Sequence, residues 1–304
     1  MSTLSYRPPE RAFLGPEGAA ARPEEAAALV VPFPLEATVT YGRGTARGPE
    51  AIIAASPELE FFDETLGHEP CRAFGIATLE TPQVAAPVAA AVDQAAALVS
   101  QALDAGHLPL VLGGEHALTA GAVRPFAERY RDLAVLQFDA HADLRDVYLG
   151  QPYSHACAMR RVLDAGHVRL VAVGLRNISA DELAFAERSR DRISLHWART
   201  RANWDPAEIV APLAGRPLYV SFDVDAFDAS LMPATGTPEP GGLFWDDAMA
   251  VLEAAAAVAT VVGADIVELA PIDGLHSCDF TGAKLAYRLL GLALTGPDNA
   301  QPPS

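Results

Sequence analysis

An apolar run that ends in three regularly spaced polar residues is the feature of this sequence that first suggests chemistry. Residues 133–138 are mostly aliphatic or aromatic, as in a strand buried on both faces, and Asp139, His141 and Asp143 follow at every second position. Side chains two apart lie on the same side of an extended chain, so the three groups would converge. Carboxylates and imidazoles bind metals, and the spacing therefore predicts a metal site, with an acidic turn as the alternative.

A second apolar segment ends in the same way. Within residues 217–228, a strand-like run delivers Asp223 and Asp225 two positions apart, and two such acidic strand ends are hard to explain as turns. His116 follows the apolar run 108–112 and a pair of glycines; taken alone, such a histidine is more often a hydrogen-bonded structural residue. Clefts in parallel sheets form at the carboxyl ends of strands, where all these residues would lie. We therefore predict that they share one site.

The candidate ligands are four carboxylates and two imidazoles, namely Asp139, Asp143, Asp223, Asp225, His116 and His141. Six ligands exceed the needs of one tetrahedral zinc but suit two divalent ions bridged by carboxylates and a solvent molecule. Oxygen-rich ligation with one imidazole per ion favours manganese over zinc, and the imidazoles argue against magnesium or calcium. Four aspartates neutralise two such ions, so an added hydroxide makes the centre anionic and suited to a cationic substrate. Water bound to such ions can be a nucleophile near pH 7, which predicts hydrolysis.

Two further polar residues could take part in a reaction. His155 lies near the start of a predicted helix, where an imidazole beside a metal centre could transfer protons, or it could be a surface residue that caps local structure. Glu268 lies in an otherwise apolar strand, and its charge needs either an arginine of the protein or a cationic ligand nearby. The residues themselves leave both choices open. Glu115 would point away from its neighbour His116, so we leave it out of the ligand set.

Several motifs, in this order, resemble those of the ureohydrolases, the family of arginases and agmatinases. They are Gly-Gly-Glu-His at 113–116, Asp-Ala-His-Ala-Asp at 139–143, Ser-Phe-Asp-Val-Asp-Ala-Phe-Asp at 221–228 and Pro-Ala-Thr-Gly-Thr-Pro at 233–238. The resemblance extends over roughly residues 28–294. It implies a three-layer α/β/α fold, a centre of two Mn²⁺ per chain, hydrolysis of a guanidinium to an amine and urea, and a homo-oligomer, either a trimer or a hexamer.

The same resemblance implies roles for individual residues. It implies two bridging carboxylates and a pair of ligands for each ion: Asp139 and Asp223 as bridges, His116 with Asp143 for one ion, and His141 with Asp225 for the other. His155 resembles the proton shuttle of the family, and Glu268 resembles the carboxylate that pairs with the guanidinium. We also expect Asp143 to take part in catalysis, and Thr237 and Tyr153 to contact the substrate.

The loop 143–155 favours one branch of this family. It lacks the Ser-Gly-Asn type of stretch with which arginases hold the α-amino acid end of their substrate, and it resembles the agmatinase branch, as does segment 38–49. The carboxylate of arginine would lose its hydration without gaining donors, which typically costs several kcal/mol. The aromatic and apolar side chains of residues 148–153 instead suit a methylene chain with an amine. We therefore expect hydrolysis of agmatine to putrescine and urea, with guanidinobutyrate or arginine as alternatives.

Two other classes of function could use a carboxylate-rich centre. A binuclear metallophosphatase would require Lys, Arg or Asn-His groups for phosphate oxygens, and the sequence shows no such Asn-His motif beside the ligands. A non-catalytic, metal-stabilised oligomeric protein would not need His155 and Glu268 in addition to a complete ligand set. The chain departs from the usual family pattern at Glu115, Ala117 and Ala229, but none of these changes removes a ligand.

The elements that must position these residues alternate along the chain. We predict strands over residues 28–33, 73–78, 108–112, 133–138, 168–174, 193–196, 217–222 and 261–269, and helices over 49–55, 84–105, 117–131, 155–163, 180–190, 245–259 and 281–294. This alternation, without a linker or a repeat, predicts a single three-layer α/β/α domain with a mostly parallel sheet. The domain would span residues 28–304, preceded by a surface arm over residues 1–27.

Composition sets the remaining limits. Half of the 304 residues are hydrophobic, but no run approaches the roughly 20 apolar residues of a membrane span, and residues 1–27 lack a signal-peptide pattern. We therefore expect a cytoplasmic protein with no membrane partner. The net charge of −17 argues against nucleic acid and is compatible with a small cationic guanidino substrate. Cys71, Cys157 and Cys278 are too few and too scattered for a disulfide framework or a cysteine-rich metal site.

Overall fold

A parallel sheet forms the centre of the protein in a computed structural model that describes residues 4–296. The outermost parts of the expected arm and domain, residues 1–3 and 297–304, lie outside the described residues. The described residues form eight strands: β1 (Ala28–Phe33), β2 (Ile76–Thr78), β3 (Leu108–Gly113), β4 (Ala134–Phe138), β5 (Arg169–Leu175), β6 (Ile193–Trp197), β7 (Pro217–Asp223) and β8 (Thr260–Val267). Their order is β2-β1-β3-β8-β7-β4-β5-β6, and every pairing between neighbours is parallel.

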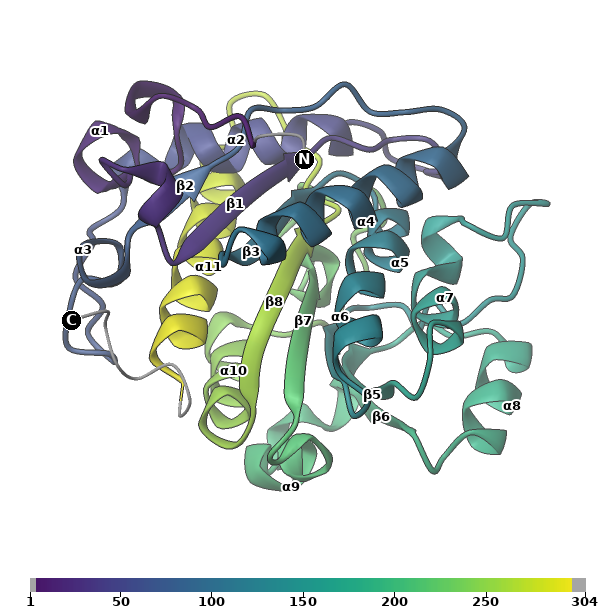
Figure 1. The fold of residues 1–304 in the computed structure, drawn as a ribbon. Coiled ribbons are helices and arrows are strands. Elements are labelled where there is room, and N and C mark those ends of the chain that lie inside the picture. Colours follow the sequence, from purple (N-terminus) through teal and green to yellow (C-terminus); the bar gives the residue numbers. More distant parts are fainter. Residues whose placement is uncertain (1–3, 297–304) are drawn as a thin grey trace.

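Helices cover both faces of this sheet (Figure 1). The α-helices of the described chain are α1 (Gly15–Gly18), α2 (Gly48–Ala55), α3 (Pro70–Phe74), α4 (Val88–Asp104), α5 (Thr119–Ala122), α6 (Arg124–Arg129), α7 (Ala158–Asp164), α8 (Ala180–Arg188), α9 (Pro206–Val210), α10 (Trp245–Val258) and α11 (His276–Thr295). The three-layer α/β/α architecture predicted from the alternation of elements is therefore confirmed. The sheet is parallel throughout its described pairings, whereas the sequence had predicted only a mostly parallel one.

Alternate residues of the strands enter two hydrophobic cores. In β1, Val30 belongs to one buried cluster, and Leu29 and Val31 belong to the other. Successive side chains of a strand point to opposite faces, so each core receives every second residue. The first cluster includes apolar residues of α2, α3, α9, α10 and α11, and the second includes residues of α4 to α8. A strand buried on both faces must be apolar at consecutive positions, which explains the uninterrupted apolar runs in the sequence.

Prolines account for two differences between the predicted and observed helices. Helix α4 begins at Val88 rather than at residue 84, because Pro87 precedes it and proline disfavours a helical conformation in the residue before it. The predicted helix 117–131 is divided into α5 and α6, with Pro125 in the first turn of α6. The predicted strand 73–78 is shorter, because α3 takes the residues up to Phe74 and β2 begins only at Ile76.

The expected surface arm is anchored in the core. Phe13 and Leu14 are 0% and 1% exposed and belong to the hydrophobic cluster that contains α2. The backbone N–H of Leu14 donates to Ser56 Oγ at 2.7 Å, which fixes the segment to the end of α2. Phe13 and Leu14 are therefore buried and do not lie at the surface, where the prediction for residues 1–27 had placed them. Among the described residues, no helix combines the length and the hydrophobicity that crossing a membrane requires.

Candidate metal centre

Four adjacent strands in the middle of the sheet deliver the candidate ligands. Strands β3, β8, β7 and β4 are neighbours in this order, and polar residues lie at or just beyond their carboxyl ends. His116 follows β3, Glu268 follows β8, Asp223 ends β7 and Asp139 follows β4. Since all four strands run in the same direction, these residues meet at one edge of the sheet, as the sequence predicted.

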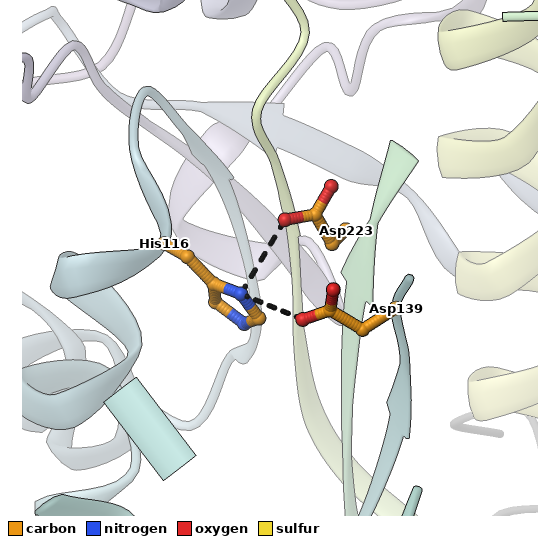
Figure 2. Close-up of side chains that lie close together, drawn as sticks. All are labelled: His116, Asp139 and Asp223. Atoms are coloured by element: carbon orange, nitrogen blue, oxygen red, sulfur yellow. Dashed lines mark ion pairs between the residues drawn. The ribbon is translucent and has the colours of Figure 1, made fainter. Parts of the chain in front are cut away.

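The first group of ligand-type atoms surrounds the Nδ1 atom of His116. This atom lies 3.2 Å from Asp139 Oδ2, 3.1 Å from Asp143 Oδ2 and 3.5 Å from Asp223 Oδ2. Figure 2 shows the imidazole of His116 turned towards the carboxylates of Asp139 and Asp223. His116 Nδ1 is buried and has no hydrogen-bond partner, which is costly unless a cation or a proton joins it to these oxygens.

The second group lies around His141 and shares one carboxylate with the first. His141 Nδ1 lies 3.0 Å from Asp225 Oδ2 and 3.6 Å from Asp139 Oδ1. Asp139 therefore directs one oxygen to each histidine. Atoms of His116, Asp139 and Asp223, and separately of Asp139, His141 and Asp225, are close enough to bind one ion each. The arrangement fits two cations that share the carboxylate of Asp139.

Backbone N–H groups fix the carboxylates. His141 N donates to Asp139 Oδ1 at 2.6 Å, Ala140 N donates to Asp225 Oδ1 at 3.0 Å, and Asp225 N donates to Asp223 Oδ1 at 2.8 Å. The short 3₁₀ helix η9 (Val224–Ala226) begins directly after Asp223 and so turns Asp225 back towards β4. These bonds orient the carboxylate groups and leave Asp223 Oδ2 and Asp225 Oδ2 facing the histidines.

The centre carries an excess of buried negative charge. The four aspartates Asp139, Asp143, Asp223 and Asp225 are at most 6% exposed, and within the described chain none of them forms an ion pair with a lysine or arginine. Burial and the neighbouring Asp225 raise the pKa of Asp223 well above its usual value, and burial and Asp139 raise the pKa of Asp143 to about 7. Buried carboxylates require compensating cations. The residues present therefore fit two divalent ions.

A buried polar network holds His116 from behind, and reasoning from the sequence missed it. His116 Nε2 lies 2.9 Å from Ser221 Oγ, and Ser221 donates to Asp265 Oδ1 at 2.7 Å. Thr119 and Tyr219 each donate to Asp265 Oδ2 at 2.8 Å. Because Ser221 donates its only hydrogen to Asp265, it accepts from His116 Nε2–H, so in the neutral imidazole Nδ1 is the unprotonated nitrogen that can serve as a metal ligand. Polar residues in the apolar strands β7 and β8 were the available signal.

A cavity of about 320 Å³ opens beside this centre. Its lining includes His141, Asp143, Asp223 and Asp225 together with three further residues predicted from the sequence: His155, Glu268 and Thr237. Tyr153 does not line the cavity but packs against the buried cluster on the α4 to α8 side of the sheet. Tyr148 lines the cavity instead. The turn formed by Tyr148 and Gln151 presents Tyr148 to the cavity and exposes 82% of Leu149.

His155 and Glu268 occupy different positions around the cavity. His155 belongs to neither group of ligand-type atoms, and burial lowers its pKa to about 4, so that its imidazole is neutral near pH 7. Glu268 Oε1 accepts the backbone N–H of His116 at 2.7 Å, and burial raises the pKa of this carboxyl to about 8. No arginine or lysine of the described chain forms an ion pair with Glu268. A cationic ligand, the other partner that the sequence left open, stays a prediction.

Comparisons with known proteins agree with this geometry. Residues 26–291 match the family described as the arginase family. The sequence is 38% identical to an N(1)-aminopropylagmatine ureohydrolase of Synechocystis sp., over 88% of this chain and 89% of that protein. It is 33% identical to an agmatinase of Bacillus anthracis, over 82% and 85%. The solved agmatine ureohydrolase of Thermoplasma volcanium superposes with a TM-score of 0.83 at 30% identity, over 93% of this chain and 94% of that one.

Proposed function

This chain belongs to the arginase family, and we propose that it is a binuclear metallohydrolase that cleaves a linear, cationic guanidine into an amine and urea. One observation carries the proposal: Asp139 is shared between two groups of ligand-type atoms whose buried carboxylates form no ion pair with a lysine or arginine of the described chain. A structural metal would not require a neutral histidine and an unpaired glutamate at the same cavity, and both His155 and Glu268 lie there.

The proposed cofactor is a pair of Mn²⁺ ions. His116 and Asp143 would hold one ion, His141 and Asp225 the other, and the carboxylates of Asp139 and Asp223 would contact both. Oxygen-rich ligation with one imidazole for each ion is the basis for manganese. Such ions supply an acidified water molecule as the nucleophile at neutral pH.

The remaining residues bind the substrate and move a proton. The carboxylate of Glu268 would accept N–H groups of the guanidinium, and its bond from His116 N fixes it beside the ligands. Attack by water on the guanidinium releases a proton, and cleavage of the C–N bond requires a proton on the departing amine. His155 would accept the first at Nε2 and donate it from the same atom to the amine, because Nδ1 is engaged by Thr38. A pKa of about 4 makes His155 a group that passes a proton on rather than one that stores it. Asp143 lines the same cavity and would assist as a ligand at the reacting end.

The substrate is proposed to be a guanidine without a carboxylate, either N(1)-aminopropylagmatine or agmatine. Three relatives that are 37% to 38% identical carry the first name, and this favours the longer amine. Agmatine, which the sequence predicted, has the support of agmatinases that are 33% identical. Arg145 lines the cavity, but its Nε lies 3.7 Å from Glu182, and its guanidinium stacks 4.9 Å from the ring of Tyr148. Arg145 is therefore already paired, and a substrate carboxylate would find no free cation there.

Urea release tests the proposal. The manganese-loaded protein would be assayed with N(1)-aminopropylagmatine, agmatine, arginine and guanidinobutyrate at equal enzyme concentration. We expect kcat/KM for the better of the two amines to exceed that for arginine by at least about 100-fold, which corresponds to about 2.7 kcal/mol of transition-state binding. Comparable efficiency with arginine or guanidinobutyrate would overturn the substrate and leave the metal chemistry standing. Release of phosphate from phosphate esters without release of urea would overturn the reaction class.

A further inference from the structure

A chain of hydrogen bonds connects His155 to the buried carboxylate of Glu115. His155 Nδ1 lies 3.1 Å from the hydroxyl oxygen of Thr38, and the backbone N–H of His155 donates to the same oxygen at 3.0 Å. The Thr38 hydroxyl in turn bonds to Glu115 Oε1 at 2.9 Å. Glu115 is 0% exposed. The hydroxyl of Thr38 thus connects the loop after β1 to Glu115 and to His155.

Some of these groups can only donate a hydrogen bond, and they determine the direction of the others. The backbone N–H groups of Ala37 and Thr38 both donate to Glu115 Oε2, at 2.8 and 2.6 Å. This carboxylate therefore serves as an acceptor, and its other oxygen receives the Thr38 hydroxyl hydrogen. A threonine hydroxyl has one hydrogen, so its oxygen is left to accept. It accepts from the backbone N–H of His155 and from the ring at Nδ1.

The consequence concerns the tautomer of His155. With Thr38 as acceptor, the neutral imidazole carries its hydrogen on Nδ1 and keeps its lone pair on Nε2. The ring is also held by the edge-to-face contact with Tyr148, whose centroid is 6.0 Å away. Ser154 Oγ, at 3.4 Å from Nδ1, is a longer and weaker contact than that of Thr38.

We propose that Thr38 and Glu115 are positioning residues that fix His155 as the Nδ1–H tautomer, so that Nε2 faces the cavity as the proton-accepting atom. The inference rests on the proposed role of His155 in proton transfer. It assigns a task to the loop after β1 and to Glu115, the residue beside His116 that the sequence analysis left out of the ligand set.

Two substitutions at Thr38 separate hydroxyl chemistry from packing. Thr38→Val replaces the hydroxyl with a methyl group of similar size and should lower kcat by about 10- to 100-fold with little change in KM, because proton transfer is worth about 10²- to 10⁴-fold and is only partly lost. Thr38→Ser restores the hydroxyl and should recover most of kcat. Thr295→Val, the same change at the far end of α11, is the matched control. An equal loss in the serine and valine variants would overturn the proposal.

Glu115→Gln tests the direction of the chain without changing its shape. The glutamine oxygen must face the two backbone N–H donors, so its amide NH₂ would face Thr38 and donate to it. The Thr38 hydroxyl would then donate to His155 Nδ1, which places the imidazole hydrogen on Nε2. We expect a loss of kcat of about 100-fold with bound metal unchanged, since a histidine held in the wrong tautomer is a poor base. Activity within about twofold of the unsubstituted protein would contradict the inference.

Imidazole ¹⁵N chemical shifts give a readout that does not depend on activity. The full-length protein would carry ¹⁵N-histidine and the diamagnetic ion Zn²⁺, with His155→Asn used to assign the signals of His155. The inference predicts a protonated Nδ1 and an unprotonated Nε2 near pH 7, and the reverse in Glu115→Gln. A protonated Nε2 in the unsubstituted protein would overturn it. If the tautomer is as predicted but no guanidine releases urea, the proposed function fails and the positioning inference stands.

Discussion

Asp139 is the residue on which both halves of the candidate centre depend. Its two oxygens face different histidines, at 3.2 Å from His116 Nδ1 and 3.6 Å from His141 Nδ1. Asp225, in contrast, approaches only His141. Removal of a shared carboxylate should therefore affect two metal positions, whereas removal of Asp225 should affect one.

Asp139→Ala, on this geometry, and Asp223→Ala, on the bridging role that the family resemblance implies, are expected to be more damaging than Asp225→Ala. Substitution of a residue that only supports a metal ligand typically lowers metal affinity or activity by about 10- to 100-fold. We therefore expect the two bridge variants to lose at least about 100-fold in activity and to retain fewer than two ions per chain. Elemental analysis and urea release on the same samples would measure both effects. Bridge variants that keep full metal content would show that Asp139 and Asp223 are not shared ligands.

His155 is predicted to act in proton transfer and not in ligation, because it lies outside both groups of ligand-type atoms and lines the same cavity. His155→Asn should lower kcat by about 10²- to 10⁴-fold, the usual contribution of a general acid or base. The metal content should not change. Loss of manganese in this variant would mean that His155 is a ligand.

Much of the site could be predicted at the scale of single residues, but not all of it. The alternation of Asp139, His141 and Asp143 is local, and an extended chain sends these side chains the same way. Ser221 and Asp265 are different, because they meet only through the register between β7 and β8, where they are paired. That register depends on the packing of the whole sheet and cannot be predicted from the sequence of either strand alone.

Among the elements, the loop after η9 is held by one carboxylate. Asp228 accepts hydrogen bonds from Ser230 Oγ and from the backbone N–H groups of Ser230, Gly241 and Gly242, at 2.6 to 3.0 Å. The bonds from Ser230 are the main cause that lowers the pKa of Asp228 to about 2. The loop that Asp228 closes carries Thr237 to the cavity.

This carboxylate gives a signed prediction for stability against pH. The pKa of Asp228 is lower in the folded state than the value of about 3.9 expected after unfolding, so the folded state binds fewer protons in this range. Its contribution to stability is present above about pH 4 and is lost as the pH falls from about 4 to about 2. In Asp228→Asn, the melting temperature should depend less on pH in this window than in the unsubstituted protein. Parallel curves for the two proteins between pH 2 and pH 4 would rule out this contribution.

Strands were easier to predict than loops. Strand β1 begins and ends at the predicted residues, because apolar runs buried on both faces have clear limits. The position of Tyr148 could not be predicted, since it depends on left-handed backbone conformations at Leu149 (φ 49°) and Gly150 (φ 77°) that turn the loop back. Leucine rarely adopts such a conformation, and the neighbouring sequence does not indicate it. The structure places Tyr148, and not Tyr153, at the cavity, and a contact of Tyr153 with the substrate stays a prediction.

At the scale of the whole molecule, the sheet order concentrates charge. Strands β3, β8, β7 and β4 are adjacent although they are far apart in the sequence, and this order places four buried aspartates at one edge. A protein with a net charge of −17 gains nothing from such a cluster unless cations occupy it. Ions that bind only the folded chain would stabilise it, so metal binding and folding are expected to be coupled.

Assembly as a trimer or hexamer remains a prediction from the family resemblance. Light scattering with size-exclusion chromatography would measure it against the chain mass of 32.0 kDa. We expect three or six times this mass. A particle of one chain mass that retains full activity would show that the site is complete within one chain.

The central claim is that the two groups of ligand-type atoms hold two ions that act together. Metal-free protein would be titrated with Mn²⁺, and bound manganese and urea release from N(1)-aminopropylagmatine and agmatine would be measured on the same samples. The account predicts that activity with the preferred amine becomes maximal when two ions are bound per chain. Maximal activity at one bound ion, or in protein from which all metal has been removed, would contradict it.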